Sequence, residues 1–211
     1  MTPKKPRQFS RPLVDSRSYF PFFVIVPEGS KTERDYFDAV KMRLTSVVLK
    51  IISSSHSSPP YLLKTMRDCL KKYQLKEHDE AWIVLDKDRW SDEQLEKLHN
   101  WSQQNARYGL ALSNPCFEYW LLLHFEKGNA AKQDVKSCLK EHLPDYDKGI
   151  SPNKITHEQV RKAVKRARER DKPPCCDWPR CCNQTTVYRL VEKILLAEEE
   201  YKRSIASNTT S

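Results

Sequence analysis

Short apolar runs alternate with longer amphipathic stretches over the first 125 residues of the chain. The runs lie at 22–26, 46–52, 81–85 and 108–112. They are bulky and partly β-branched, which is typical of strands buried on both faces. Between them, apolar residues recur three and four positions apart, as in helices that bury one side. Four alternations of strand and helix predict an α/β fold with a mostly parallel, four-stranded sheet and right-handed crossovers.

The chain loses strand patterns after Gly128, and helices are predicted at 132–143, 156–172 and 186–203. Helix starts are indicated by Ser91 with Gln94, which are placed for a capping box, and by Asn114 with Pro115, an N-cap followed by a proline at the first helical position. The predicted organisation is a basic, flexible tail at 1–17, an α/β core at 18–128, a helical extension at 129–203 and a flexible polar tail at 204–211.

Two acids, Asp86 and Asp88, follow the third apolar run and are separated by one residue. In an extended chain they point the same way, and two close carboxylates repel each other unless a cation or a proton joins them. Ligands of open α/β sheets gather at the carboxyl ends of strands. The pattern therefore predicts a divalent-metal site at the rim of the sheet, although an isolated pair of acids is also typical of a solvated loop.

Three further acids are predicted near the carboxyl ends of strands, either directly after a strand or in the first turn of the helix that follows it. Glu28 follows the first strand, Glu33 lies in the first turn of the next helix, and Glu118 lies in the first turn of the helix after the fourth strand. The helix dipole alone favours an acid in a first turn, so Glu33 and Glu118 also have a purely structural interpretation. His124 is interpreted as a core histidine, or as one that supports a metal ligand, rather than as a metal ligand itself.

The formal charge of +9, from 37 basic and 28 acidic residues, favours a polyanionic partner, with nucleic acid first and an anionic membrane surface second. The predicted helix at 156–172 concentrates this charge. Its candidate phosphate contacts are Arg161, Lys162, Lys165 and Arg168. A solvated face or a docking face for a partner protein are the alternatives.

The seven cysteines point to a reducing cytoplasm, because their number is odd and no signal peptide is recognised. No apolar run is long enough to span a bilayer. No membrane partner is expected. Four thiols, at Cys175, Cys176, Cys181 and Cys182, could hold a zinc ion, but adjacent cysteines are not the usual ligand spacing.

Three segments resemble the RloB family of proteins. The first is PEGSKTERDYF at 27–37, which resembles the family's E-G-x-x-T-E-x-x-Y-F opening. The second is LDKDRW at 85–90, which resembles its D-x-D segment, and the third and longest is SNPCFEYWLLLHF at 113–125. Weaker matches are YDK at 146–148 and TVYRLVE at 186–192. The resemblance covers about 22–193 and implies a Toprim-like catalytic domain, in which Glu28, Asp86 and Asp88 match the acidic positions. It also implies a role in bacterial defence against phage beside an ABC-type ATPase.

The expected activity is hydrolysis of phosphodiester bonds in DNA or RNA, tRNA among them, with Mg²⁺ or Mn²⁺, because the candidate ligands are hard carboxylates. Asp86 and Asp88 would hold the ion, and Glu28 would be a further ligand or the general base. Glu33 and Glu118 could complete a second metal position, and Lys148 could stabilise the charged transition state.

A non-catalytic module that binds nucleic acid or a partner protein is the main alternative. A receiver-like phosphoacceptor domain using Asp86 and a topoisomerase are disfavoured. The choice between one and two metals, the need for an ATPase partner and the oligomeric state stay open.

Overall fold

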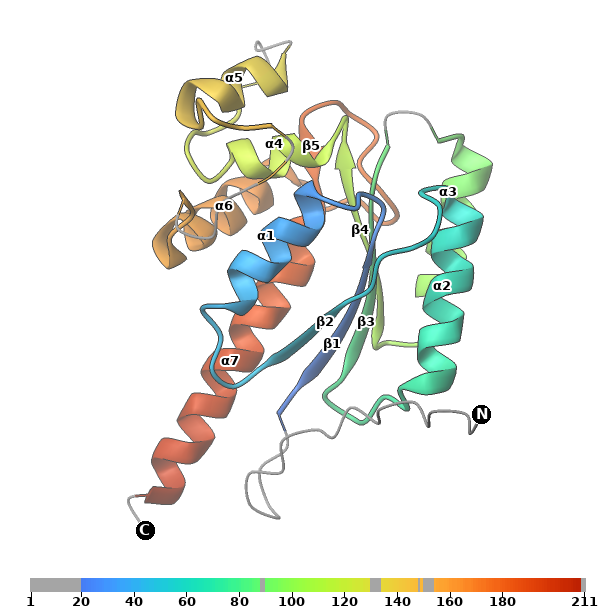
Figure 1. Cartoon of the computed structure of the whole chain (residues 1–211), viewed down its shortest axis with the longest axis vertical. Coiled ribbons are helices and arrows are strands. Elements are labelled where there is room, and N and C mark those ends of the chain that lie inside the picture. The colour runs from blue at the N-terminus through green and yellow to red at the C-terminus, as the bar shows by residue number, and fades with distance from the viewer. Residues whose placement is uncertain (1–19, 88–89, 130–133, 148, 150–153, 210–211) are drawn as a thin grey trace, which may run out of the picture.

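The computed structural model describes residues 20–87, 90–129, 134–147, 149 and 154–209 of the chain. Its sheet consists of β1 (Phe22–Pro27), β2 (Val48–Ile51), β3 (Glu80–Asp86), β4 (Tyr108–Asn114) and β5 (Gln184–Thr185), in the order β2-β1-β3-β4-β5 (Figure 1). The first four strands are parallel, as predicted, and β5 is antiparallel to β4. The predicted count of four strands was one too low, because a strand of two residues carries no periodic pattern.

Seven helices are assigned among the described residues. They are α1 (Thr32–Lys41), α2 (Pro59–Lys72), α3 (Asp92–Ser102), α4 (Phe117–Leu122), α5 (Val135–His142), α6 (His157–Arg170) and α7 (Val187–Thr209). Capping boxes start α3, at Ser91 and Gln94, and α6, at Thr156 and Gln159. The first was predicted. The last helix continues to Thr209 and so runs beyond its predicted end at Arg203.

The start of α4 differs from the prediction. Asn114 still belongs to β4, its peptide bond to Pro115 is cis, and Cys116 is the N-cap. The Asn114 side-chain amide does not cap the helix but donates to the backbone carbonyls of Pro179 and Arg180, at 3.1 and 3.3 Å. The asparagine therefore attaches the loop before β5 to the carboxyl end of β4.

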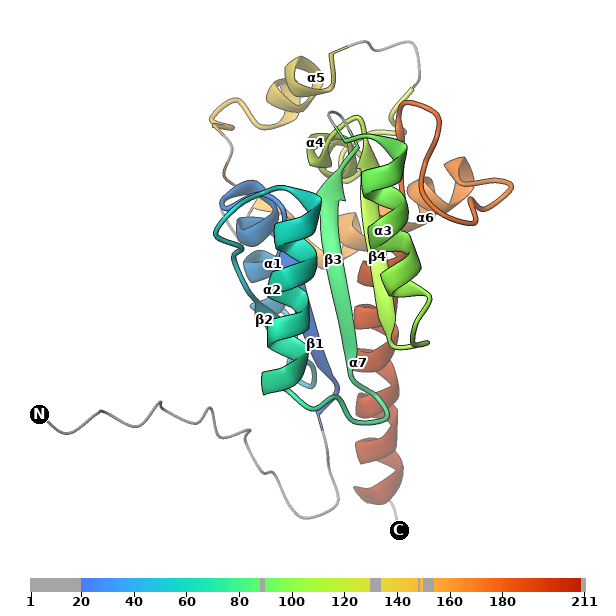
Figure 2. The same ribbon diagram turned by 90° about the vertical axis from the view of Figure 1, so that its right-hand side faces the viewer.

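The two faces of the sheet are covered by different helices. Along β1, Phe23 and Ile25 pack with α1, α4, α6 and α7, whereas Phe22, Val24 and Val26 pack with α2 and α3. Figure 2 shows α2 and α3 in front of the sheet and α7 behind it. Because both faces are covered, these strands read as continuous apolar runs.

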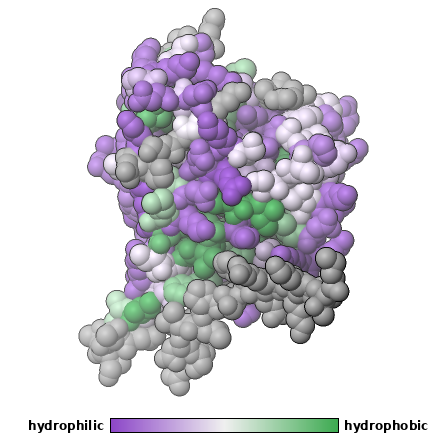
Figure 3. Space-filling view, viewed as in Figure 1, coloured by the Kyte–Doolittle hydropathy of each residue, from purple (hydrophilic) through white to green (hydrophobic). Residues whose placement is uncertain are grey.

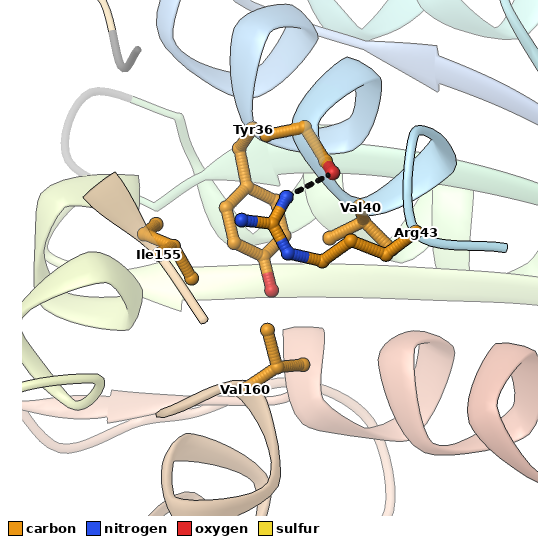
Figure 4. A pocket seen from close by; sticks show the side chains of 6 residues that line it. Tyr36, Val40, Arg43, Ile155 and Val160 are labelled. Atoms are coloured by element: carbon orange, nitrogen blue, oxygen red, sulfur yellow. Dashed lines mark hydrogen bonds between the residues drawn. The ribbon is translucent and has the colours of Figure 1, made fainter. Parts of the chain in front are cut away.

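The predicted helical extension shares its core with the α/β part. Val187, Val191 and Ile194 of α7 are fully buried in the same cluster as Phe37 and Trp120. Tyr36 and Val40 of α1 face Ile155 and Val160 across a small hollow (Figure 4). The Arg43 side chain also lines this hollow and donates to the Ala39 carbonyl at 2.9 Å.

No helix in the described ranges has the length and apolar character needed to cross a membrane.

His124 lies in the core, as predicted. Its Nδ1 is 3.1 and 3.2 Å from the carbonyls of Trp120 and Leu121, and its Nε2 is 3.3 Å from the Tyr36 hydroxyl. Carbonyls only accept hydrogen bonds, so Nδ1 carries the proton and Nε2 accepts from Tyr36. Burial lowers the pKa of His124 from 6.5 to about 4, and the ring is therefore neutral near pH 7.

This burial predicts a loss of stability in mild acid. Between about pH 6.5 and 4 the unfolded chain binds a proton at His124 that the folded chain does not, so the free energy of unfolding falls as the pH falls, by up to about 3 kcal/mol. Urea unfolding of the wild type and of His124→Gln across this range measures the effect. The variant should be less stable at neutral pH but should show a flatter pH dependence. Parallel pH curves would contradict the assignment.

Candidate active site

The chain reverses its direction of progress across the sheet between β1 and β3. From β1 it moves outward to β2, then returns to β3 on the other side of β1 and continues to β4. Such a switch point leaves a crevice at the carboxyl ends of the two strands, where ligands of open α/β sheets bind. Pro27 of β1 pairs with Val84 of β3, so Glu28 and Asp86 follow at the same edge. These carboxyl ends lie toward the top of Figure 1.

Glu28 joins the ends of the two strands. Its backbone N–H donates to the Val84 carbonyl at 2.8 Å. Its carboxylate accepts from the Asp86 backbone N–H at 3.0 Å and from the Trp90 indole N–H at 3.2 Å. Each carboxylate oxygen has a further lone pair, so Glu28 can also bind a cation. Trp90 was not predicted as a site residue.

Asp86 ends β3 and is half-buried beside Ser113 of β4. By the alternation along β3 it lies on the side of Trp82 and Val84, the face covered by α1 and α4. The pKa of the neighbouring Cys116 thiol is raised first by burial and then by the charges of Glu118 and Asp86. Asp86 and Glu118 therefore act on the same small region.

Glu33 is 5% exposed and accepts a hydrogen bond from the Gly29 backbone N–H at 3.2 Å. Its pKa is raised from 4.5 to about 6, mainly by burial, with contributions from the nearby charges of Glu28 and Glu118. A Cβ at position 29 would lie 1.9 Å from the Glu33 Oε2, so the Glu33 carboxylate can occupy this position only because residue 29 is a glycine.

Glu118 is also buried, in the first turn of α4. Its Oε1 accepts from the Tyr146 hydroxyl at 3.2 Å and lies 3.8 Å from the Lys136 ammonium. The Tyr146 hydroxyl is also 3.3 Å from the Thr32 hydroxyl, so it bridges α1 and α4. Tyr146 was noticed only as part of a weak motif match, and Lys136 was missed, because neither position has a pattern that marks it.

We call Glu28, Glu33, Asp86 and Glu118 the acidic centre. Carboxylate oxygens suit a hard cation such as Mg²⁺ or Mn²⁺. Burial is the main cause of the raised pKa of Glu33, and a cation would relieve the smaller part that comes from the charges of Glu28 and Glu118. Within the described ranges, no three His, Cys, Asp or Glu side chains form a group that could hold a metal ion. The predicted ligand Asp88 and the predicted Lys148 lie outside the described residues.

The predicted basic stripe on α6 is largely engaged with acids. Arg161 and Arg168 form ion pairs with Glu199 and Glu192 of α7, and Lys162 pairs with Glu158 at 2.7 Å. Lys165 is exposed. The two arginine pairs connect α6 to α7, so part of the charge that suggested a phosphate-binding stripe helps to hold two helices together.

The four clustered thiols are all described and all reduced. Cys176, Cys181 and Cys182 are exposed, and burial raises the pKa of Cys175 to about 11. The Cys175 Sγ contacts the Arg189 guanidinium at 3.4 Å, and Asp171 accepts from the Cys175 backbone N–H. None of the four belongs to a group of three potential ligands among the described residues. The zinc alternative thus gains no support.

Neutralising Glu33 should stabilise the protein near neutral pH. Its raised pKa means that the folded chain binds a proton more tightly than the unfolded chain, so the benefit is present below about pH 4.5 and is lost as the pH rises through about 6. Above that pH, Glu33→Gln should be more stable than the wild type by up to about 2 kcal/mol. Urea unfolding at neutral pH tests this, with Glu200→Gln on the exposed side of α7 as the control. A destabilised variant would mean that the carboxylate has a strong favourable partner.

A comparison with protein-family models matches the description "RloB-like protein" over residues 23–194. No curated protein and no solved structure matches the chain. The matched range includes all of the acidic centre and most of the described chain. The protein belongs to the RloB-like family.

Proposed function

We propose that this protein is a metal-dependent nuclease with a Toprim-like catalytic domain. The observation that carries the proposal is the placement of Glu28 and Asp86 at the ends of β1 and β3, at the switch point of the sheet, where the Asp86 backbone donates to the Glu28 carboxylate. Glu33 and Glu118 lie in the first turns of α1 and α4 at the same edge. A glutamate after the first strand and an aspartate at the end of the third match the acidic positions of the Toprim-like pattern. The family resemblance adds a role in bacterial anti-phage defence with an ABC-type ATPase as partner.

In this proposal Asp86 and Asp88 hold Mg²⁺ or Mn²⁺, and Glu28 is a further ligand or the base for the attacking water. A bound ion would polarise the phosphate and lower the pKa of a coordinated water. Asp86 and Glu28 are already oriented relative to each other, because the backbone of one donates to the carboxylate of the other. Glu33 and Glu118 are available for a second cation, and Tyr146 holds Glu118 in place. The positively charged Lys148 would stabilise charge that develops on the phosphate.

One observation favours the alternative of a non-catalytic module in a defence complex. Both carboxylate oxygens of Glu28 accept hydrogen bonds from neighbouring N–H groups, and this arrangement ties β1 to β3 without a metal. A structural glutamate would behave differently from a ligand in the unfolding experiment with Mn²⁺ described below.

Replacement of Asp86 by Asn should abolish cleavage while the fold is kept, because the amide has the same shape but is a poor ligand for Mg²⁺. Purified protein would be incubated with total bacterial RNA, tRNA and plasmid DNA, with and without Mn²⁺, and in the presence of the ATPase partner if the chain alone is inactive. Asp68→Asn, in an exposed position near the end of α2, is the matched control and should cleave as the wild type does. Full activity of Asp86→Asn would show that the acidic centre is not catalytic.

Mn²⁺ should raise the unfolding temperature of the wild type. A ligand present at 100 times its dissociation constant stabilises the folded state by about 2.7 kcal/mol. The shift should disappear in Asp86→Asn and should persist in Asp68→Asn. Glu28→Gln separates the two interpretations, because a structural glutamate changes the unfolding temperature without metal, whereas a ligand changes the shift that Mn²⁺ produces. An equal shift in all these variants would place the binding of Mn²⁺ elsewhere.

A further inference from the structure

An acidic centre that cleaves nucleic acid must overcome its own repulsion of the phosphates. Four carboxylates at one edge of the sheet create a negative potential, so cations near that edge are needed to hold a polyanion there. The structure places four basic residues from four separate segments around the acidic centre. We call them the basic rim; they are Lys31, Lys87, Lys136 and Arg180.

Two members of the basic rim lie on the side of α1 and α5. Lys31 immediately precedes α1, is exposed, and donates to the Asp147 carbonyl at 3.0 Å. The Lys136 ammonium is 3.8 Å from Glu118, and its side chain is 57% exposed. Lys31 donates to a carbonyl at the surface, so it can exchange this contact for a phosphate. Lys136 offsets the charge of the buried Glu118, and its mostly exposed side chain can also reach a phosphate.

The other two members meet at Asp92, at the start of α3. The Lys87 ammonium is 3.2 Å from one carboxylate oxygen of Asp92, and the Arg180 guanidinium is 2.8 Å from the other. Lys87 directly follows Asp86, and its backbone N–H donates to the Ser113 carbonyl at 2.8 Å. Asp92 therefore joins the loop that carries Arg180 to the end of β3, beside the acidic centre.

Arg180 is prepared for contact with phosphate. Its guanidinium lies 4.1 Å from the centre of the Trp178 ring, while half of the side chain remains exposed. Trp178 itself is buried, so it is a fixed support. The two terminal nitrogens of Arg180 donate to Asp92 and Asp177, so the stacked guanidinium is held in one orientation by two carboxylates. The N–H groups that these carboxylates do not use match the geometry of a phosphate.

The arginines of α6 are also paired, but with residues of α7 and of the segment after α4 rather than with residues at the carboxyl ends of the strands. Arg161 and Arg168 pair with Glu199 and Glu192 of α7. Arg166 and Arg170 donate to the backbone carbonyls of Leu123 and Lys127, at 2.7 and 2.9 Å. These contacts attach α6 to α7 and to the segment after α4.

Figure 3 shows that the upper part of the visible face, at the carboxyl end of the sheet, is mainly hydrophilic.

We propose that the basic rim, rather than the surface of α6, contacts the phosphodiester backbone of a nucleic-acid strand that enters the acidic centre. The inference rests on the proposed nuclease function, which it supplements with the location of substrate binding. Binding can be measured without cleavage, so the two proposals can fail separately.

The test compares two triple variants with the same change of charge. The rim variant carries Lys31→Gln, Lys136→Gln and Arg180→Gln, and the α6 variant carries Arg161→Gln, Lys165→Gln and Arg168→Gln. Fluorescently labelled single-stranded DNA and RNA oligonucleotides are titrated with each protein in EDTA over a series of salt concentrations. The rim variant should flatten the plot of log affinity against log salt by about two units on a single strand, because three phosphate contacts are lost. The α6 variant should keep the wild-type slope.

A wild-type slope in the rim variant, a loss confined to the α6 variant, or a wild-type protein that binds neither oligonucleotide would each overturn the proposal. A binding defect in the rim variant supports it even if no strand is ever cleaved, in which case the nuclease proposal alone fails. Thermal unfolding verifies the fold of both variants. If the rim variant is unstable, Lys136→Gln alone should lower the slope by about 0.7, since Lys136 is mostly exposed. Arg180→Lys should keep the slope but weaken binding, because it keeps the charge and loses the stacked, planar donor group.

Discussion

The parallel pairing of β1 with β3 is the constraint on which the site depends. Both strands are buried on both faces, so their register is fixed by the apolar residues that they place in the two cores. That register brings Glu28 and Asp86 to the same edge and allows the backbone of Asp86 to donate to the Glu28 carboxylate. A shift by one residue would turn Asp86 into the layer below α2 and α3. The acidic positions are therefore a consequence of how the core is packed.

Crowding of carboxylates has a cost that the surrounding residues reduce. Gly29 leaves the space that the Glu33 carboxylate occupies, and its N–H donates to that carboxylate. Glu118 is stabilised by the Tyr146 hydroxyl, which donates a hydrogen bond to its carboxylate, and by the positive charge of Lys136. Even so, burial and, to a lesser extent, the charges of Glu28 and Glu118 keep the pKa of Glu33 raised, so the folded protein holds this carboxylate in an unfavourable environment. An acid in such an environment is typical of functional sites rather than of acids selected for stability.

Much of this arrangement follows from local sequence. The four long strands carry continuous apolar runs, and the capping box at Ser91 and Gln94 marks a helix start through neighbouring residues alone. The acids Glu28, Asp86, Glu33 and Glu118 could be placed at one edge because each follows a strand or begins a helix. Tyr146 and the two-residue β5 could not be found in this way. Their roles depend on contacts between distant parts of the chain. Tyr146 contacts Glu118, which is 28 positions away, and β5 pairs with Ser113, which is about 70 positions away.

A cluster of basic residues in the sequence is a weaker guide to a binding surface than strand-end acids are to a candidate active site. Six basic residues on α6 form an obvious cluster in the sequence, yet two of them face acids of α7 that lie about 25 to 40 positions away. Lys31, Lys87, Lys136 and Arg180 are scattered over the chain and attract no attention as a group. The fold gathers them because each is adjacent to a carboxyl end of a strand or contacts a residue that is. A polyanion responds to the charges that surround the site in space, so the scattered set is the better candidate for its binding surface.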